Sequence, residues 1–139
     1  MRLAGKDNMN SILVVDDDAD SRDAVAKYLT KAGYVVRSAA NGRAALISLL
    51  TVNPDVVILD VRMPEMDGIE LLEVMRSYLR LAKLPVILLT AYPEGEQIDR
   101  ARELSVHAVF SKANYSLANL KSCVEKLMAD PGAQCDVAQ

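Results

Sequence analysis

Short apolar runs alternate along the chain with longer stretches in which apolar residues recur every three or four positions. Short runs rich in β-branched residues are typical of strands buried on both faces of a parallel sheet, whereas the longer repeat is typical of amphipathic helices. The strands predicted from these runs cover residues 11–15, 35–39, 56–59, 86–90 and 108–110. This alternation predicts an α/β fold, a doubly wound five-stranded parallel sheet with helices on both faces.

A helix is expected after each strand, and several helix ends carry residues that commonly start or stop helices. Asp18 or Asp20 can cap the first helix, Gly33 can close it, and Asp67-Gly68 can open the third helix. The apolar positions expected to face the core are Ala24, Val25, Tyr28, Leu29 and Ala32 in the first helix, Ala45, Leu46, Leu49 and Leu50 in the second, Ile69, Leu72, Met75 and Leu79 in the third, Ile98, Ala101 and Leu104 in the fourth, and Leu117, Leu120, Val124 and Leu127 in the fifth.

The third apolar run stops abruptly at a carboxylate, Asp60, which is followed by a constrained loop. Pro64 biases Met63 toward extended backbone geometry, and Asp67-Gly68 then forms a turn that can lead into a helix. Asp60 is therefore expected at the carboxyl end of a central strand. In open parallel sheets, ligands bind at that edge.

Composition limits the classes of function. A chain of 139 residues with 51% hydrophobic residues fits one domain with a sizeable core. The net charge of −3 and the scattered lysines and arginines predict no direct nucleic-acid binding. No apolar run approaches the roughly 20 residues of a membrane span, and the first ten residues lack a signal-peptide core, so no membrane association and a cytoplasmic location are expected.

The chain ends and the cysteines carry no recognisable pattern. Residues 1–10 and 130–139 are expected to be disordered tails that flank a domain over residues 11–129. Cys123 and Cys135 show neither metal-ligand spacing nor a disulfide framework, so both are expected to be free thiols. His107, alone in a loop before the fifth strand, is expected to be a surface residue.

Polar side chains follow four of the five predicted strands. These are Asp16 and Asp17 after the first strand, Asp60 after the third, Thr90 at the end of the fourth and Lys112 after the fifth. If the strand order is 2-1-3-4-5, the three carboxylates meet in one crevice. Three negative charges about 4 Å apart repel by roughly 4 kcal/mol per pair at an effective dielectric constant near 20. Hard oxygen ligands without clustered cysteine or histidine then favour Mg²⁺, or Mn²⁺.

This set of residues suits phosphoryl transfer to a carboxylate. Asp60 is the predicted nucleophile, and Asp17, Asp16 (directly or through water), Asp60 and the main-chain carbonyl of Arg62 are the predicted metal ligands. Lys112 would hold one phosphoryl oxygen, and the Thr90 hydroxyl would meet another once the group arrives.

The motifs Val14-Val15-Asp16-Asp17, Leu59-Asp60-Val61-Arg62-Met63-Pro64-Glu65-Met66-Asp67-Gly68, Leu89-Thr90-Ala91 and Ser111-Lys112 resemble the receiver domain of two-component response regulators. The resemblance runs from Ser11 to about Met128. It implies a flavodoxin-like fold and a single-domain signalling switch that is not an enzyme beyond catalysing its own phosphorylation and dephosphorylation. It also implies transfer of phosphate to Asp60 from a histidine kinase or a histidine phosphotransfer protein, dependence on Mg²⁺, and a monomer or weak homodimer acting on an unknown downstream protein.

Two positions depart from the family pattern. Ala113 stands where a proline usually follows the family lysine, so a trans Lys112-Ala113 peptide is expected. Val109 stands where an aromatic residue usually swings inward on phosphorylation. Output is therefore expected to rely on the Thr90-to-Tyr92 loop and the fourth helix, with Tyr92 as a substitute reporter, and the resemblance implies that Arg62 and Tyr92 tune the lifetime of the phosphate.

Alternatives remain open at this point. A phosphohydrolase of the haloacid dehalogenase-like kind also uses an aspartate nucleophile, a Thr or Ser, a lysine and Mg²⁺, but its Asp-x-Asp pattern fits residues 16–20 poorly. A receiver that has lost its switch would act as an unphosphorylated interaction module. A calcium loop over Asp16-x-Asp18-x-Asp20 lacks the glycine and glutamate that such loops need. The expected contact surface for a downstream protein is Ile98 to Leu104 with the last helix.

Overall fold

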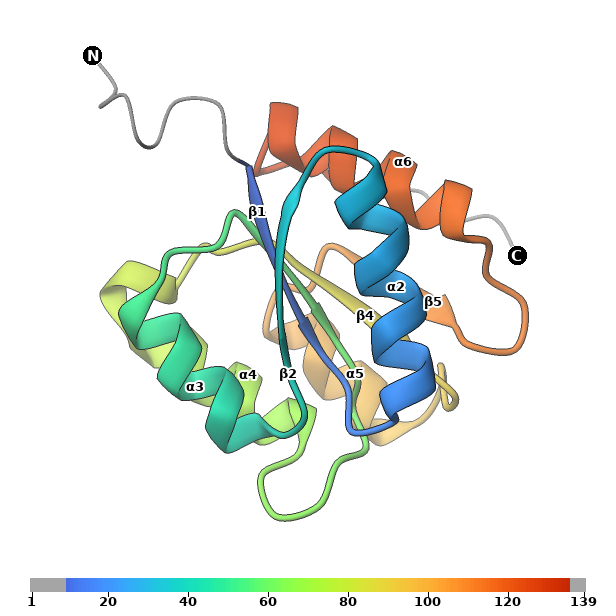
Figure 1. The fold of residues 1–139 in the computed structure, drawn as a ribbon. Helices are drawn as coiled ribbons and strands as arrows, with labels where there is room; N and C mark the ends of the chain where they lie inside the picture. Colours follow the sequence, from blue (N-terminus) through green and yellow to red (C-terminus); the bar gives the residue numbers. More distant parts are fainter. Residues whose placement is uncertain (1–9, 136–139) are drawn as a thin grey trace.

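The computed structural model describes residues 10–135, which form a five-stranded parallel sheet in the order β2-β1-β3-β4-β5 (Figure 1). The predicted fold class and strand order are confirmed. The strands are β1 (Ser11–Val15), β2 (Val35–Ala39), β3 (Val56–Leu59), β4 (Val86–Thr90) and β5 (Ala108–Ser111). All four pairings are parallel, so the carboxyl ends of the strands share one edge.

Helices cover both faces of the sheet (Figure 1). One face carries α2 (Ala19–Lys31) and α6 (Leu117–Ala129), and the other carries α3 (Gly42–Thr51), α4 (Gly68–Ser77) and α5 (Glu96–Glu103). A short 3₁₀ turn, η1 (Leu79–Leu81), follows α4. None of the helices in residues 10–135 has the length and apolar character needed to cross a bilayer.

Two cores result because successive strand residues point to opposite faces. Ile12 and Val14 of β1 pack with α2 and α6, whereas Leu13 and Val15 pack with the three helices of the other face. β3 is buried along its whole length. The buried, largely β-branched runs seen in the sequence are therefore central strands covered on both sides.

The predicted helix ends are confirmed where the structure tests them. The Asp18 side chain accepts from the Asp20 N–H at the start of α2, and Gly33 just after that helix has φ of 105°. Asp67 and Glu70 form a capping box at the start of α4. These caps fix the places where the chain leaves the sheet edge and enters a helix.

Four residues expected in the core are exposed, namely Ala24, Ala32, Leu50 and Leu79. Leu79 is 95% exposed because α4 ends at Ser77 and the chain then turns through η1. Leu50 is 41% exposed at the end of α3. For Leu79, the apolar periodicity continued past the point where the backbone leaves the helix, whereas Leu50 lies within the last turn of α3, where the core covers only part of the apolar face.

His107 is buried, so its predicted place on the surface is wrong. Its Nδ1 accepts from the Val86 N–H at 3.3 Å, and its own N–H donates to the Val86 carbonyl at 2.8 Å. A third hydrogen bond joins His107 to the main chain of Pro131. Burial lowers the pKa of His107, and the nearby charge of Arg76 lowers it further.

The predicted free thiols are also wrong, because Cys123 and Cys135 form a disulfide. α6 turns Cys123 toward the core, and the turn at residues 130–132 brings the chain back so that Cys135 reaches it. The Cys135 N–H donates to the His107 carbonyl at 3.2 Å. Ala133 and Cys135 thus pack against the core within the segment that was expected to be a disordered tail over residues 130–139. The rest of that tail and residues 1–9 lie outside the described residues.

Candidate functional site

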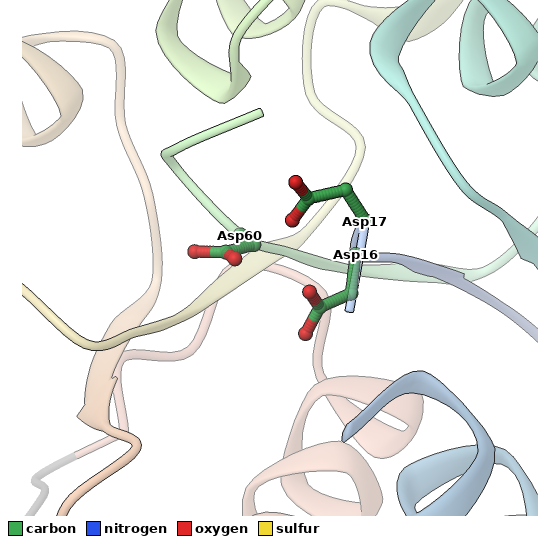
Figure 2. Close-up of side chains that lie close together, drawn as sticks. All are labelled: Asp16, Asp17 and Asp60. Carbon is green, nitrogen blue, oxygen red and sulfur yellow. The ribbon is translucent and has the colours of Figure 1, made fainter. Parts of the chain in front are cut away.

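The acidic residues meet at the carboxyl edge of the sheet because β1 and β3 are adjacent. Val15 lies opposite Leu59 in the register, so the residues that follow each strand come side by side. Carboxylate oxygens of Asp16, Asp17 and Asp60 all lie within 4.8 Å of one another (Figure 2). The structure therefore brings together the three carboxylates that the strand-end pattern singled out.

Lys112 closes the cluster from the end of β5. Its Nζ lies 2.8 Å from Asp16 Oδ2 and 3.1 Å from Asp60 Oδ2, so one ammonium bridges two carboxylates. Asp16 and Asp60 are buried, and Asp17 is exposed. The bridge holds both buried acids in fixed positions while Asp17 faces solvent.

The pKa values follow from this burial and pairing. Burial raises the pKa of Asp60, Lys112 lowers it through a hydrogen bond and its charge, and the charge of Asp16 raises it again, so that the net direction is upward. Burial lowers the pKa of Lys112, but its hydrogen bonds to Asp16 and Asp60 outweigh this and the net direction is upward. Lys112 therefore stays protonated at neutral pH.

One ammonium cannot neutralise three carboxylates. The Lys112 ammonium offsets only part of the charge of the three carboxylates, so the cluster keeps an excess of negative charge. Closely spaced carboxylate oxygens are the hard ligands that Mg²⁺ or Mn²⁺ prefers, and the exposed Asp17 leaves the cluster open to solvent. The donor set fits a small divalent cation.

Asp60 is held from its own loop as well. Its Oδ1 accepts from the Val61 N–H at 2.7 Å, and the Gly68 N–H donates to the Val61 carbonyl at 2.8 Å. Gly68 packs so closely on the Asp60 main chain that a Cβ there would collide with the Asp60 carbonyl oxygen. The loop between Asp60 and α4 thus needs glycine at this position to keep its path.

Thr90 and Arg62 lie in the two loops next to the cluster. Thr90 is fully buried, and its hydroxyl oxygen accepts from the Tyr92 N–H at 3.1 Å. The Arg62 guanidinium stacks on the Tyr92 ring, 4.0 Å from its centroid, and so connects the loops after β3 and β4. Asp17 and Arg62 line an open surface depression together with Met63, Pro64, Asp67 and Gln97. The role of the Arg62 carbonyl as a metal ligand stays a prediction.

One residue near the site was not singled out from the sequence. Arg22, on the first turns of α2, donates from Nη1 to the Asp16 carbonyl at 2.8 Å. An arginine on a helix that follows an acidic strand end is the signal that could have found it. By itself the sequence does not tell such an arginine from one that points into solvent.

The two departures from the family pattern have simple outcomes. The described residues contain no cis peptide bond, so the predicted trans Lys112-Ala113 peptide is confirmed. Val109 is partly buried against the core on the α4 and α5 side.

On α5, Ile98 and Ala101 are buried, so they are not available to the contact surface expected over Ile98 to Leu104.

Comparison with known proteins agrees with this geometry. The family model "Response regulator receiver domain" matches residues 12–125. The chain is 46% identical over 88 residues to the regulatory protein AtoC of Escherichia coli, covering 63% of the chain but 19% of that protein. It is 35% identical to the sporulation initiation phosphotransferase F of Bacillus subtilis over 117 residues, which cover 84% of the chain and 92% of the relative.

A solved structure also resembles this chain in fold and sequence. The response regulator TrrA of Thermotoga maritima, in complex with Mg²⁺ and BeF, superposes with a TM-score of 0.73 at 34% identity, covering 86% of this chain and 99% of that one. The match to the family model spans most of the chain, from β1 into α6. With its strand order and its acidic strand ends, this chain therefore belongs to the response-regulator receiver domain family.

Proposed function

We propose that the protein is a phospho-accepting switch in which Asp60 receives a phosphoryl group from a histidine kinase or a histidine phosphotransfer protein. The observation that carries this proposal is the cluster itself. Three carboxylates lie within 4.8 Å of one another, and the Lys112 ammonium bonds to Asp16 and Asp60. Crowded carboxylates of this kind are costly to a fold unless a cation offsets their charge, and such clusters are typical of functional sites.

Asp60 is the nucleophile in the proposed reaction. A lone pair of its carboxylate forms the new O–P bond while the P–N bond to the donor imidazole breaks, and the imidazole keeps the electron pair and takes up a proton. The Val61 N–H holds Oδ1 of Asp60 at 2.7 Å, which limits rotation of the carboxylate. Because Oδ1 accepts this bond, Oδ2, which now faces Lys112, is the atom left to attack.

Lys112 and Thr90 receive the phosphoryl group. When Asp60 Oδ2 is esterified, its pairing with Lys112 is lost and the ammonium becomes free to hold a phosphoryl oxygen. The Thr90 hydroxyl, whose oxygen accepts from the Tyr92 N–H, keeps its proton to donate to another. Mg²⁺ bound by Asp16, Asp17, Asp60 and the Arg62 carbonyl would supply the positive charge that the phosphoryl oxygens require.

The relatives support the proposal. The TrrA structure was obtained with Mg²⁺ and BeF, and the B. subtilis relative, of which the matched residues cover 92%, is named a phosphotransferase. The switch would act through protein contacts. Because the Thr90 hydroxyl bonds to the Tyr92 N–H and Tyr92 stacks on Arg62, a phosphoryl group that recruits Thr90 would disturb the Thr90-to-Tyr92 loop and the start of α5.

Incubation with acetyl phosphate and Mg²⁺, followed by intact-mass measurement, tests the proposal. The wild type should gain one phosphoryl group, and the gain should disappear with a chelator or in Asp60→Asn. A matched control, Asp23→Asn, removes an exposed carboxylate from α2 and should gain the group as the wild type does. No added mass on the wild type would favour the unphosphorylated interaction module instead.

A turnover assay separates the switch from a phosphohydrolase. With a generic phosphate ester such as p-nitrophenyl phosphate, a phosphohydrolase releases product continuously, whereas the receiver should release little. Sustained turnover that Asp60→Asn abolishes would overturn the proposed switch in favour of the enzyme.

A further inference from the structure

Every polar main-chain and side-chain group of Asp16 has a partner. Its N–H donates to the Ala39 carbonyl at 3.1 Å, its Oδ1 accepts from the Asp18 N–H at 3.0 Å, and its Oδ2 meets Lys112 at 2.8 Å. The remaining group, the Asp16 carbonyl, accepts from Arg22 Nη1 at 2.8 Å. This last contact differs from the others because it fixes the peptide that joins Asp16 to Asp17.

The orientation of that peptide sets the position of Asp17. A change in ψ of Asp16 rotates this peptide plane and moves Asp17 with it, and ψ is one of the two soft dihedrals of a residue. Asp17 is exposed, so the core does not hold its side chain in place as it holds Asp16 and Asp60. The Arg22 contact is partly buried, and a charge-assisted hydrogen bond of this kind is stronger than a neutral one.

We propose that Arg22 is a positioning residue for the cation site: its guanidinium holds the Asp16 carbonyl so that the Asp17 carboxylate points toward Asp60. This inference rests on the proposed function, because it concerns the affinity of the same site for Mg²⁺. Arg22 touches neither the reacting carboxylate nor the cation in this role. It acts through the main chain of the acidic segment.

The sign of the effect separates positioning from simple electrostatics. Arg22 adds a positive charge beside the cluster, so a purely electrostatic role predicts that Arg22→Gln binds Mg²⁺ more tightly than the wild type. Loss of positioning predicts weaker binding. A residue that merely stabilises the turn before α2 would lower the stability to urea and leave the Mg²⁺ affinity unchanged.

Calorimetric titration with MgCl₂ on the full chain tests the inference, together with the Mg²⁺ dependence of phosphorylation by acetyl phosphate. Arg22→Gln should raise the Mg²⁺ dissociation constant about tenfold, the scale of losing part of one charge-assisted hydrogen bond. The maximal rate at saturating Mg²⁺ should change little, because Asp60, Thr90 and Lys112 are intact. Arg22→Lys, which keeps one donor and the charge, should recover most of the affinity.

Arg43→Gln is the matched control, since it makes the same change at an exposed position of α3 and should bind Mg²⁺ as the wild type does. Unchanged or tighter Mg²⁺ binding by Arg22→Gln, in a wild type that is phosphorylated normally, would overturn the positioning role alone. If Arg22→Gln does not fold, Arg22→Lys carries the test, and equal affinity in Arg22→Lys and an Arg22→Met variant would overturn it. A wild type that neither binds Mg²⁺ nor accepts phosphate would overturn both proposals.

Discussion

Asp60→Asn is expected to make the metal-free protein more stable. The variant removes one of three clustered negative charges but keeps the shape of the side chain and one oxygen, which can accept from either Val61 or Lys112. Because burial raises the pKa of Asp60 above 3.8, ionising this residue opposes folding. The penalty is complete above the raised pKa of the folded state and disappears as the pH falls below 3.8.

The magnitude follows from the distances. Two unit charges 4.8 Å apart repel by about 3.5 kcal/mol at an effective dielectric constant near 20, and Asp60 meets both Asp16 and Asp17 within that distance. The attraction between the Asp60 carboxylate and the Lys112 ammonium at 3.1 Å opposes this repulsion by about 5 kcal/mol. The repulsions exceed the attraction by about 2 kcal/mol, and solvent around the exposed Asp17 reduces this. We expect a gain of about 1–2 kcal/mol in the free energy of unfolding.

Urea denaturation followed by far-ultraviolet circular dichroism measures the effect, with a chelator and then with Mg²⁺. In the chelator, the midpoint of Asp60→Asn should lie above that of the wild type, and Asp23→Asn should match the wild type. At a Mg²⁺ concentration ten times its dissociation constant, the wild type should gain about 1.4 kcal/mol, and Asp60→Asn should gain less because it has lost a ligand.

An Asp60→Asn variant that is less stable than the wild type without metal would refute this reasoning, because it would mean that the Lys112 pairing outweighs the repulsion and burial. A wild type whose stability does not respond to Mg²⁺ would refute the second half, in which the cation relieves the crowding of charge.

Three further predictions concern the surrounding structure. Gly68→Ala should cost about 1–3 kcal/mol of stability and slow the phosphorylation of Asp60, because the added Cβ collides with the Asp60 carbonyl oxygen; urea denaturation and intact mass measure the two effects. Reducing the Cys123–Cys135 disulfide, which closes a loop with a sequence separation of 12, should cost about 3 kcal/mol in urea denaturation with and without dithiothreitol. The free energy of unfolding should also fall as the pH drops below about 6.5, because His107 has a lower pKa in the folded protein and therefore takes up a proton more readily in the unfolded chain. Urea denaturation of the wild type and His107→Gln at a series of pH values measures this contribution.

Each of these has a clear contrary result. Gly68→Ala with wild-type stability would mean that the loop can move away from the Asp60 main chain without cost. Equal midpoints with and without dithiothreitol, or thiols that react with a thiol reagent in the untreated protein, would contradict the stabilising disulfide. If the stability difference between the wild type and His107→Gln is the same at pH 5 as at pH 8, the buried histidine does not contribute to the pH dependence.

The sequence was enough for features that depend on neighbours along the chain. Strand bounds were readable because the central strands, above all residues 56–59, are covered on both faces and must be apolar throughout. Helix starts were readable where a cap uses the local sequence, as Asp18 and Asp67 do. The acidic cluster was readable too, because parallel strands put their carboxyl ends at one edge and the order of the strands places Asp16 beside Asp60.

The tertiary structure decided what depends on contacts between distant segments. His107 lies buried where it forms hydrogen bonds with Val86 and Pro131, and Cys123 reaches Cys135 because the chain turns back after α6. Arg22 contacts the acidic segment because α2 brings its guanidinium to the Asp16 carbonyl. A residue type and its local pattern fix which conformations are favourable, but the partner that a side chain meets is set by how the elements pack, and that information is spread over the whole chain.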